Sequence, residues 1–280
     1  MLLEIAVGDA YGAGFEFCAR EKIERHNTLA AYMPHECGIE AGRYTDDTQM
    51  SVAVAEVLLA SGTWTSDAFA DAFVQTYRRD RRMGYAKGLQ GLLDECNSGK
   101  ELRQRIRPDS RRNGAAMRSV PLGLIPDKHL VLATAREQAV VTHNTPEGIL
   151  SSQVVALMAH HLMHADAALV DLPQLIQRDT GFELRTDWSS HVECDAIQTL
   201  HAVSTALLRN RCMSDLLRDC VNFGGDVDSV AAIAMGLASL TKEYSPGIPL
   251  HLHGGLECGL YGAGFLAQLD ATLAERFLRP

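Results

Sequence analysis

The chain has 280 residues, with a hydrophobic fraction of 46 % and a charged fraction of 22 %, values typical of a globular protein with a substantial core. Its net charge of -9 argues against nucleic acid and an anionic membrane surface as partners. Seven scattered cysteines without a Cys-x-x-Cys pair, no signal peptide and no apolar run of about 20 residues predict a reduced cytoplasmic protein, which we expect to be a monomer.

The apolar periodicity is helical along most of the chain, and strand-like alternation is scarce. Alanine is frequent within the apolar runs, which favours helix over strand. The segment 171–190 is looser, since Pro173 and Gly181 interrupt it. We therefore expect an all-α fold, a single compact domain over 1–280. The predicted helices lie near 47–60, 66–80, 84–97, 130–141, 146–164, 195–208, 213–222, 228–241 and 258–277.

Two adjacent carboxylates stand directly before the first predicted helix, in the run Tyr44-Thr45-Asp46-Asp47-Thr48. This helix has few polar residues, so it should be buried. One interpretation is capping, because Asp46 and Gln49 have the spacing of a capping box. Capping needs only one short polar side chain, however, and a second buried carboxylate must find a partner or be neutralised. Taken alone, the doublet still fits capping better than ligand binding.

The segment from Arg78 to Arg118 is strongly basic, with twelve Lys and Arg residues against five Asp and Glu residues. Such a segment is usually a solvated surface. The alternative is a rim that attracts a small anionic ligand, such as a pyrophosphate.

A second acidic motif, Phe223-Gly224-Gly225-Asp226-Val227-Asp228-Ser229, precedes another helix with almost no polar face. Capping is again possible. If the two helix starts meet, however, four carboxylates converge, and two divalent cations would cancel their repulsion. Hard oxygen ligands favour Mg²⁺ or Mn²⁺ over a structural zinc ion. The oxygen ligands on offer belong to Thr45, Asp46, Asp47, Asp226, Asp228 and Ser229.

Five blocks in this order resemble the ADP-ribosylglycohydrolase family, and the resemblance extends from about Gly8 to about Gly262. Its N-terminal block is most similar to the bacterial dinitrogenase reductase-activating branch. The blocks are Gly8-Asp9-Ala10-Tyr11-Gly12-Ala13-Gly14-Phe15-Glu16, Thr45-Asp46-Asp47-Thr48, Asn113-Gly114-Ala115-Ala116-Met117-Arg118, Val141-Thr142-His143, and Gly224-Gly225-Asp226-Val227-Asp228-Ser229.

The resemblance implies an all-helical fold with a two-metal centre, usually of Mg²⁺ and sometimes of Mn²⁺. Its metal ligands would be Thr45, Asp46, Asp47, Asp226, Asp228 and Ser229. Ser229 stands where the family often has threonine, and it keeps the hydroxyl. Glu16 would be the acid/base residue, and Asp47 would be essential for catalysis. The residues that line the substrate cleft would be Asn113, Gly114, Met117, Arg118, His143, Gly224 and Gly225.

The implied activity is metal-dependent hydrolysis of the C1″ glycosidic bond of an ADP-ribose conjugate, with release of ADP-ribose. The substrate would be an ADP-ribosylated protein, with arginine favoured as the modified side chain, or a small molecule that contains ADP-ribose. Two alternatives stay open. One is a non-catalytic ADP-ribose binder or crystallin-like structural relative, and the other is a two-metal phosphohydrolase that acts on the pyrophosphate.

Overall fold

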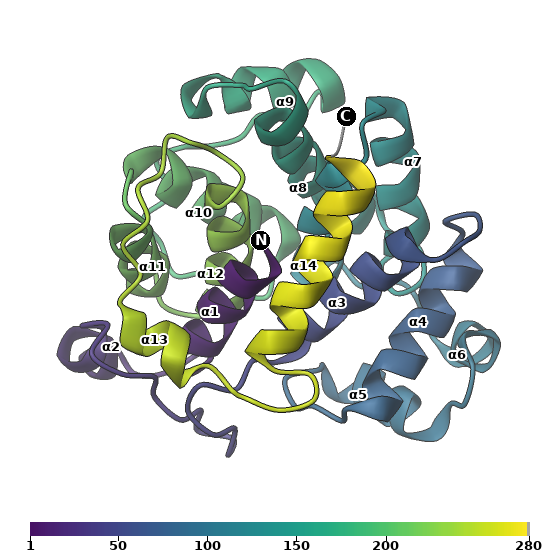
Figure 1. Cartoon of the computed structure of the whole chain (residues 1–280), viewed down its shortest axis with the longest axis horizontal. Coiled ribbons are helices and arrows are strands. Elements are labelled where there is room, and N and C mark those ends of the chain that lie inside the picture. The colour runs from purple at the N-terminus through teal and green to yellow at the C-terminus, as the bar shows by residue number, and fades with distance from the viewer. Residues whose placement is uncertain (279–280) are drawn as a thin grey trace.

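The computed structural model describes residues 1–278, and within this range the chain forms fourteen α-helices and three short 3₁₀ helices (Figure 1). Only isolated β-bridges, and no strands, occur among the described residues, which confirms the all-α prediction. The α-helices are α1 (Leu2–Ala13), α2 (Arg20–His26), α3 (Asp46–Leu59), α4 (Ser66–Arg79), α5 (Lys87–Glu95), α6 (Gly99–Arg105), α7 (Lys128–Ala139), α8 (Pro146–His164), α9 (Leu172–Thr180), α10 (Ala196–Arg209), α11 (Met213–Asn222), α12 (Val227–Ala238), α13 (Leu250–Gly255) and α14 (Ala263–Phe277). The 3₁₀ helices are η1 (Asn113–Ala115), η2 (Val120–Leu124) and η3 (Leu169–Asp171).

All nine predicted helices are present, as α3, α4, α5, α7, α8, α10, α11, α12 and α14. The largest boundary error concerns α14, which was expected to begin at 258. The chain instead turns between Glu257 and Ala263, closed by hydrogen bonds from Gly262 N to Gly259 O (3.2 Å) and from Ala263 N to Glu257 O (3.0 Å). The prediction failed there because these glycines favour a turn over a helix.

Five helices were not predicted: α1, α2, α6, α9 and α13. In α9, Pro173 and Gly181 had suggested a looser stretch. Proline is tolerated in the first turn of a helix, and Gly181 ends this one in the left-handed conformation, with φ 74°. The two residues therefore mark the start and the end of a helix.

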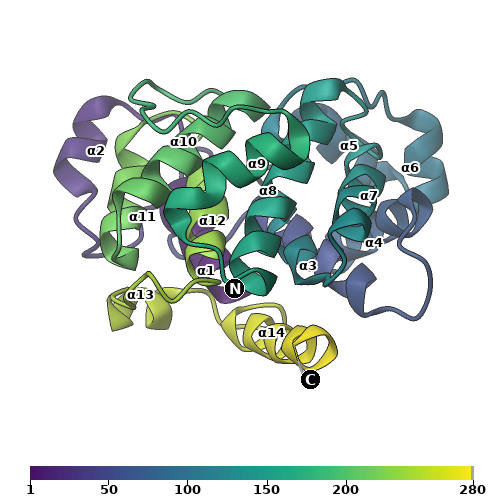
Figure 2. The ribbon, with the colours of Figure 1, turned by 90° about the horizontal axis from the view of Figure 1, so that it is seen from above.

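The N-terminal helix α1 lies against α12 near the middle of the molecule, as both views show (Figures 1 and 2). Two glycines of α1 allow this close approach. A Cβ atom on Gly8 would lie 2.5 Å from the carbonyl oxygen of Ala231, and one on Gly12 would lie 2.4 Å from Cα of Asp228. Neither distance is sterically possible, so the two glycines serve the close packing of α1 against α12.

The apolar core surrounds α1, α3 and α12, whose residues are almost all buried. Helix α14 covers one face of this arrangement with Leu266, Leu269 and Leu273, and Figure 2 shows it at the edge of the molecule. Because α3 and α12 are buried on all sides, the polar residues at their starts cannot reach bulk solvent over most of their surface. They must therefore be satisfied inside the protein or by a ligand.

None of the described helices has the combination of length and apolar composition that crossing a bilayer requires. A single domain over 1–280, a monomeric state, a cytoplasmic location and the absence of a nucleic-acid partner stay predictions.

Candidate active site

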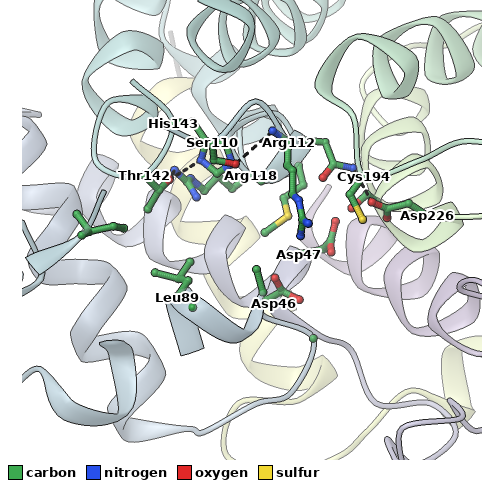
Figure 3. A pocket seen from close by; sticks show the side chains of 18 of the residues that line it. Asp46, Asp47, Leu89, Ser110, Arg112, Arg118, Thr142, His143, Cys194 and Asp226 are labelled. Atoms are coloured by element: carbon green, nitrogen blue, oxygen red, sulfur yellow. Dashed lines mark hydrogen bonds between the residues drawn. The ribbon is translucent and has the colours of Figure 1, made fainter. Parts of the chain in front are cut away.

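A cavity of about 620 Å³ opens where the starts of α3 and α12 meet. Figure 3 shows Asp46 and Asp47 near Asp226 and Cys194, with Arg118, Thr142 and His143 across the cavity. The sequence-predicted residues that line it are Glu16, Asp46, Asp47, Asn113, Gly114, Met117, Arg118, His143, Asp226, Asp228 and Ser229. Three others, Thr45, Gly224 and Gly225, do not line it. The structure thus brings together two acidic motifs separated by about 180 residues, while the individual roles stay predictions.

Asp46 and Asp47 form the first turn of α3. Asp46 is half-buried, whereas Asp47 is 3 % exposed and its Oδ1 atom has no hydrogen-bond partner. Burial, followed by the negative charge of Asp9, holds the pKa of both carboxyls well above the ordinary range. A cation bound beside this orphaned oxygen would offset the repulsion between the carboxylates.

The α12 side of the cavity begins with a turn at Gly224 and Gly225, whose φ angles are 76° and 91°. Val192 fixes this turn, since its N–H donates to Gly224 O (3.0 Å) and its carbonyl accepts from Asp226 N (2.8 Å). The two glycines therefore shape the backbone that carries Asp226 and do not contact the cavity. Only glycine adopts these left-handed angles without strain.

Glu16, Asp226 and Asp228 each present one carboxylate oxygen, and these three atoms lie within 4.8 Å of one another. Asp226 also accepts a hydrogen bond from Asn113 Nδ2 (3.0 Å). Burial, and then the negative charge of Glu16, hold the pKa of Asp228 well above the ordinary range. Glu16 thus lies much closer to the acidic group than its distance along the sequence suggested.

The capping interpretation of the first doublet is wrong for Asp46. Neither Thr45 nor Asp46 caps α3 with its side chain. Gln49, the other half of the expected capping box, instead donates to Asp80 O (2.5 Å) and accepts from the Tyr85 hydroxyl (2.7 Å). The start of α3 is capped by Asp9 of α1, which the sequence-based interpretation had not considered for this role.

His35 is a residue of the site that sequence reasoning missed. Its Nε2 atom lies 2.8 Å from Oε2 of Glu16, and its Nδ1 atom accepts a hydrogen bond from Cys37 N (2.8 Å). Because Nδ1 is an acceptor, the ring proton is on Nε2 and is donated to Glu16. This bond leaves Oε1 of Glu16 available to the cavity. No sequence pattern around His35 indicated the contact.

Arg118 lies in the wall opposite the carboxylates, but most of its guanidinium faces the protein. Nε donates to Gln138 Oε1, and Nη2 donates to Gln138 O (3.1 Å) and to Thr142 Oγ1 (2.8 Å). The guanidinium also stacks 4.5 Å above the ring of Phe73. Burial lowers the pKa of Arg118 to about 9. Only Nη1 is left without an acceptor among the described residues.

His143 is buried in the same wall, and its Nδ1 atom lies 2.6 Å from Thr142 Oγ1. Burial, together with the positive charges of Arg118 and Arg112, lowers the pKa of His143 to about 3. The imidazole is therefore neutral at physiological pH.

The basic segment is for the most part a solvated surface, as its simpler interpretation predicted. Several of its arginines pair with acidic residues outside the cavity, among them Arg79 with Glu56 (2.7 Å). Arg107 and Arg112 differ, because they line the cavity, are exposed and make no ion pair within the described chain. These two residues were part of the predicted basic segment but had not been singled out. They add unpaired positive charge to the lining of the cavity.

The residues of the acidic side fit divalent cations. All the donors are oxygens, from carboxylates and hydroxyls, and one of them is buried without a partner. No lysine or arginine forms an ion pair with any of the four aspartates in the described structure. Mg²⁺ and Mn²⁺ prefer this donor set.

A model of the family "ADP-ribosylglycohydrolase" matches residues 1–279. The ADP-ribosyl-[dinitrogen reductase] glycohydrolase of Rhodospirillum rubrum is 30 % identical over 85 % of this chain and 83 % of its own length. The ADP-ribosylarginine hydrolase Tri1 of Serratia proteamaculans is 24 % identical over 87 % of this chain and 71 % of its own length. A solved structure titled "ADP-ribosylglycohydrolase-related protein complex" has the same fold, with a TM-score of 0.73, 24 % identity and coverage of 99 % of this chain and 95 % of its own.

Proposed function

The chain belongs to the ADP-ribosylglycohydrolase family and is an enzyme of the glycosidase class, and from this premise we propose that it hydrolyses the C1″ bond of ADP-ribosylated protein side chains, with arginine favoured. The observation that carries the proposal is the convergence of four aspartates and Glu16 in one cavity, with Oδ1 of Asp47 buried and unpartnered. The names of the two bacterial relatives, one an arginine hydrolase, support arginine.

Two divalent cations, Mg²⁺ or Mn²⁺, would occupy the acidic side of the cavity. Bound there, they would neutralise the carboxylates and act as Lewis acids toward the ribose hydroxyls. The residues that would hold them are Thr45, Asp46, Asp47, Asp226, Asp228 and Ser229. Among these, Asp47 carries the orphaned oxygen, so its removal should be the most damaging.

Glu16 is the proposed acid/base residue. Hydrolysis of a glycosidic bond passes through an oxocarbenium-like state at the anomeric carbon, which nearby carboxylates stabilise. His35 holds Oε2 of Glu16, and Oε1 is left to take a proton from the attacking water and to pass it to the departing nitrogen. Proton transfer of this kind contributes about 10²–10⁴-fold to the rate.

The diphosphate of the substrate would lie along the opposite side of the cavity. Arg107 and Arg112 supply unpaired positive charge to the cavity, and Arg118 offers Nη1. Neutral His143 adds a polar group without a competing negative charge. The opposite charges of the two sides thus orient the ligand, with ribose at the aspartates and phosphates at the arginines.

The decisive experiment compares ADP-ribosyl-arginine, ADP-ribosyl-serine and ADP-ribose oligomers as substrates, with Mg²⁺ and with chelator. We expect release of intact ADP-ribose from the arginine conjugate, with at least a tenfold preference over the other two and loss of activity in chelator. Release of AMP would instead identify a phosphohydrolase. Calorimetric binding of ADP-ribose without any turnover would identify the non-catalytic alternative.

A further inference from the structure

Asp9 is the most deeply buried carboxylate near the active site, and the reaction proposed above gives it no role. It lies on α1, is 0 % exposed and makes no ion pair within the described chain. We propose that Asp9 is a positioning residue that orients the Thr45 hydroxyl, and with it the start of α3, for divalent-cation binding. This inference rests on the proposed metal-dependent function.

The hydrogen bonds of Asp9 all come from two threonines of the α3 motif. Its carboxylate accepts from Thr45 N (2.9 and 3.0 Å to the two oxygens) and from Thr45 Oγ1 (2.8 Å). It also accepts from Thr48 N (2.9 Å) and from Thr48 Oγ1 (2.6 Å). The carboxylate therefore satisfies two backbone N–H groups that the helix itself leaves free.

The direction of the Thr45 hydroxyl proton follows from these bonds. A hydroxyl has one proton and two lone pairs, and a carboxylate can only accept. The proton of Thr45 Oγ1 must therefore point to Asp9, so the lone pairs point elsewhere. A hydroxyl binds a cation through a lone pair, and its proton must be directed away. Thr45 itself does not line the cavity, so Asp9 acts on the site by fixing the residue that directly precedes Asp46 and Asp47.

Other helices of this chain show that a distant, buried carboxylate is not needed for capping alone. Helix α4 is capped by Thr65, α8 by Thr145 and α10 by Asp195, each from the position directly before its helix. Thr45 occupies the same position before α3 and is a good capping residue, yet its side chain does not cap. Because Asp9 takes over that task, the Thr45 hydroxyl is free for another role.

The same helix also fixes the second half of the site. Gly12, three residues after Asp9, packs against the backbone of Asp228, so closely that no Cβ atom would fit between them. Helix α1 therefore contacts the starts of both α3 and α12. A change at Asp9 should loosen the α3 ligands relative to the α12 ligands, without removing any ligand.

The test is titration of the metal-free full-length protein with Mn²⁺, followed by loss of the free-ion EPR signal. Asp9→Asn keeps the shape of the side chain, but it replaces one carboxylate oxygen with an NH₂ group. That group cannot accept the hydrogen bonds that Thr45 and Thr48 donate. We expect a 10- to 100-fold weaker Mn²⁺ affinity, the usual effect of removing a group that orients a metal ligand. Circular dichroism and thermal melting check that the variant is folded.

A matched pair at Thr48 tests the same inference if Asp9→Asn does not fold. Thr48→Val removes one hydrogen bond to Asp9 with no change of shape, and Thr48→Ser restores it. We expect a roughly tenfold loss of Mn²⁺ affinity with valine and recovery with serine. Thr205→Val is the control, because it removes a buried hydroxyl of α10 that lies outside the cavity.

Two results would overturn the inference in distinguishable ways. If the wild type binds Mn²⁺ and folded Asp9→Asn or Thr48→Val binds it within twofold as tightly, Asp9 is only a helix cap. If the wild type binds no Mn²⁺ at all, the metal centre of the proposed function fails, and this inference fails with it.

Discussion

The two sides of the cavity differ in whether their buried polar groups find partners within the protein. On the acidic side, Asp47 has an oxygen without a partner, and mutual repulsion adds to burial in raising the pKa of Asp46, Asp47 and Asp228. On the opposite side, Arg118 is bonded to Gln138 and Thr142. The first side holds carboxylates that repel one another, whereas the buried groups of the second, Arg118 and His143, are hydrogen-bonded within the protein.

This difference separates the residues that we expect to act in catalysis from those that we expect to stabilise the fold. Removal of a carboxylate on the acidic side should change catalysis more than folding, because it removes a charge that the protein alone does not stabilise. A substitution among the satisfied groups of the opposite side should leave a buried partner without its hydrogen bond, and so reduce stability. Measuring both quantities for each variant therefore tests the comparison directly.

The largest expected effect is that of Asp47→Asn on turnover. Removing the carboxylate with the orphaned oxygen should lower kcat by about 10³-fold or more, a loss of about 4 kcal/mol of transition-state stabilisation. The melting temperature of the metal-free protein should not fall, since the asparagine removes a repelling charge. Steady-state kinetics with ADP-ribosyl-arginine and calorimetric melting measure the two. An active variant, or one that unfolds, would contradict the proposed division.

A pair of glycine substitutions gives the next largest effect, this time on stability. Gly225→Ala would place a Cβ atom 1.9 Å from the carbonyl oxygen of Val192 at a φ of 91°, so the backbone of the acidic side must shift. Gly114→Ala on the opposite side would meet only the His143 ring, at 2.9 Å. We expect losses of about 3 kcal/mol and about 1 kcal/mol in the free energy of unfolding, measured in urea. Equal losses would show that the two sides tolerate backbone change alike.

Sequence periodicity was sufficient for nine of the fourteen helices in the described part of the chain, because burial of one stripe or of a whole helix leaves a local pattern. It did not predict α1, in which Gly8 and Gly12 serve close packing against α12. The reason for these two glycines is the contact with α12, which lies more than 200 residues away. A local sequence pattern cannot indicate such a contact.

The same limit applies to the site. The two acidic motifs were recognisable, but their meeting could be inferred only from the cost of crowding charges and from the family resemblance. Asp9 caps a helix that starts 37 residues later, and His35 bonds Glu16 from another loop. Arg118 was assigned to the cavity by the family resemblance, yet a sequence cannot tell which way a guanidinium points.

The pH dependence of stability offers a smaller, quantitative test of the opposite side. The pKa of His143 is lowered to about 3, so the folded protein keeps this imidazole neutral while the unfolded chain takes up a proton below about 6.5. The unfolded state then binds more protons, and folding stability falls as the pH drops from 6.5 toward 3. The penalty from this one group should be about 1.4 kcal/mol at pH 5.5.

Comparison with His143→Gln isolates that contribution, since all other groups cancel in the difference. Urea unfolding at pH 7.5 and at pH 5.5 should show a smaller decrease for the variant than for the wild type. An identical decrease in both proteins would mean that His143 can be protonated in the folded state.

The smallest expected effect concerns the thiol of Cys194, which lines the cavity beside the carboxylates. Burial, and then the negative charge of Asp226, raise the pKa of this thiol, so little thiolate is present at pH 8. Cys37 and Cys258 are exposed and should react with iodoacetamide first, as followed by peptide mass spectrometry. Asp226→Asn removes one source of negative charge and should speed labelling of Cys194 by about twofold. Rapid labelling of Cys194 in the metal-free wild type would mean that the acidic side lacks the strong negative potential on which the comparison of the two sides depends.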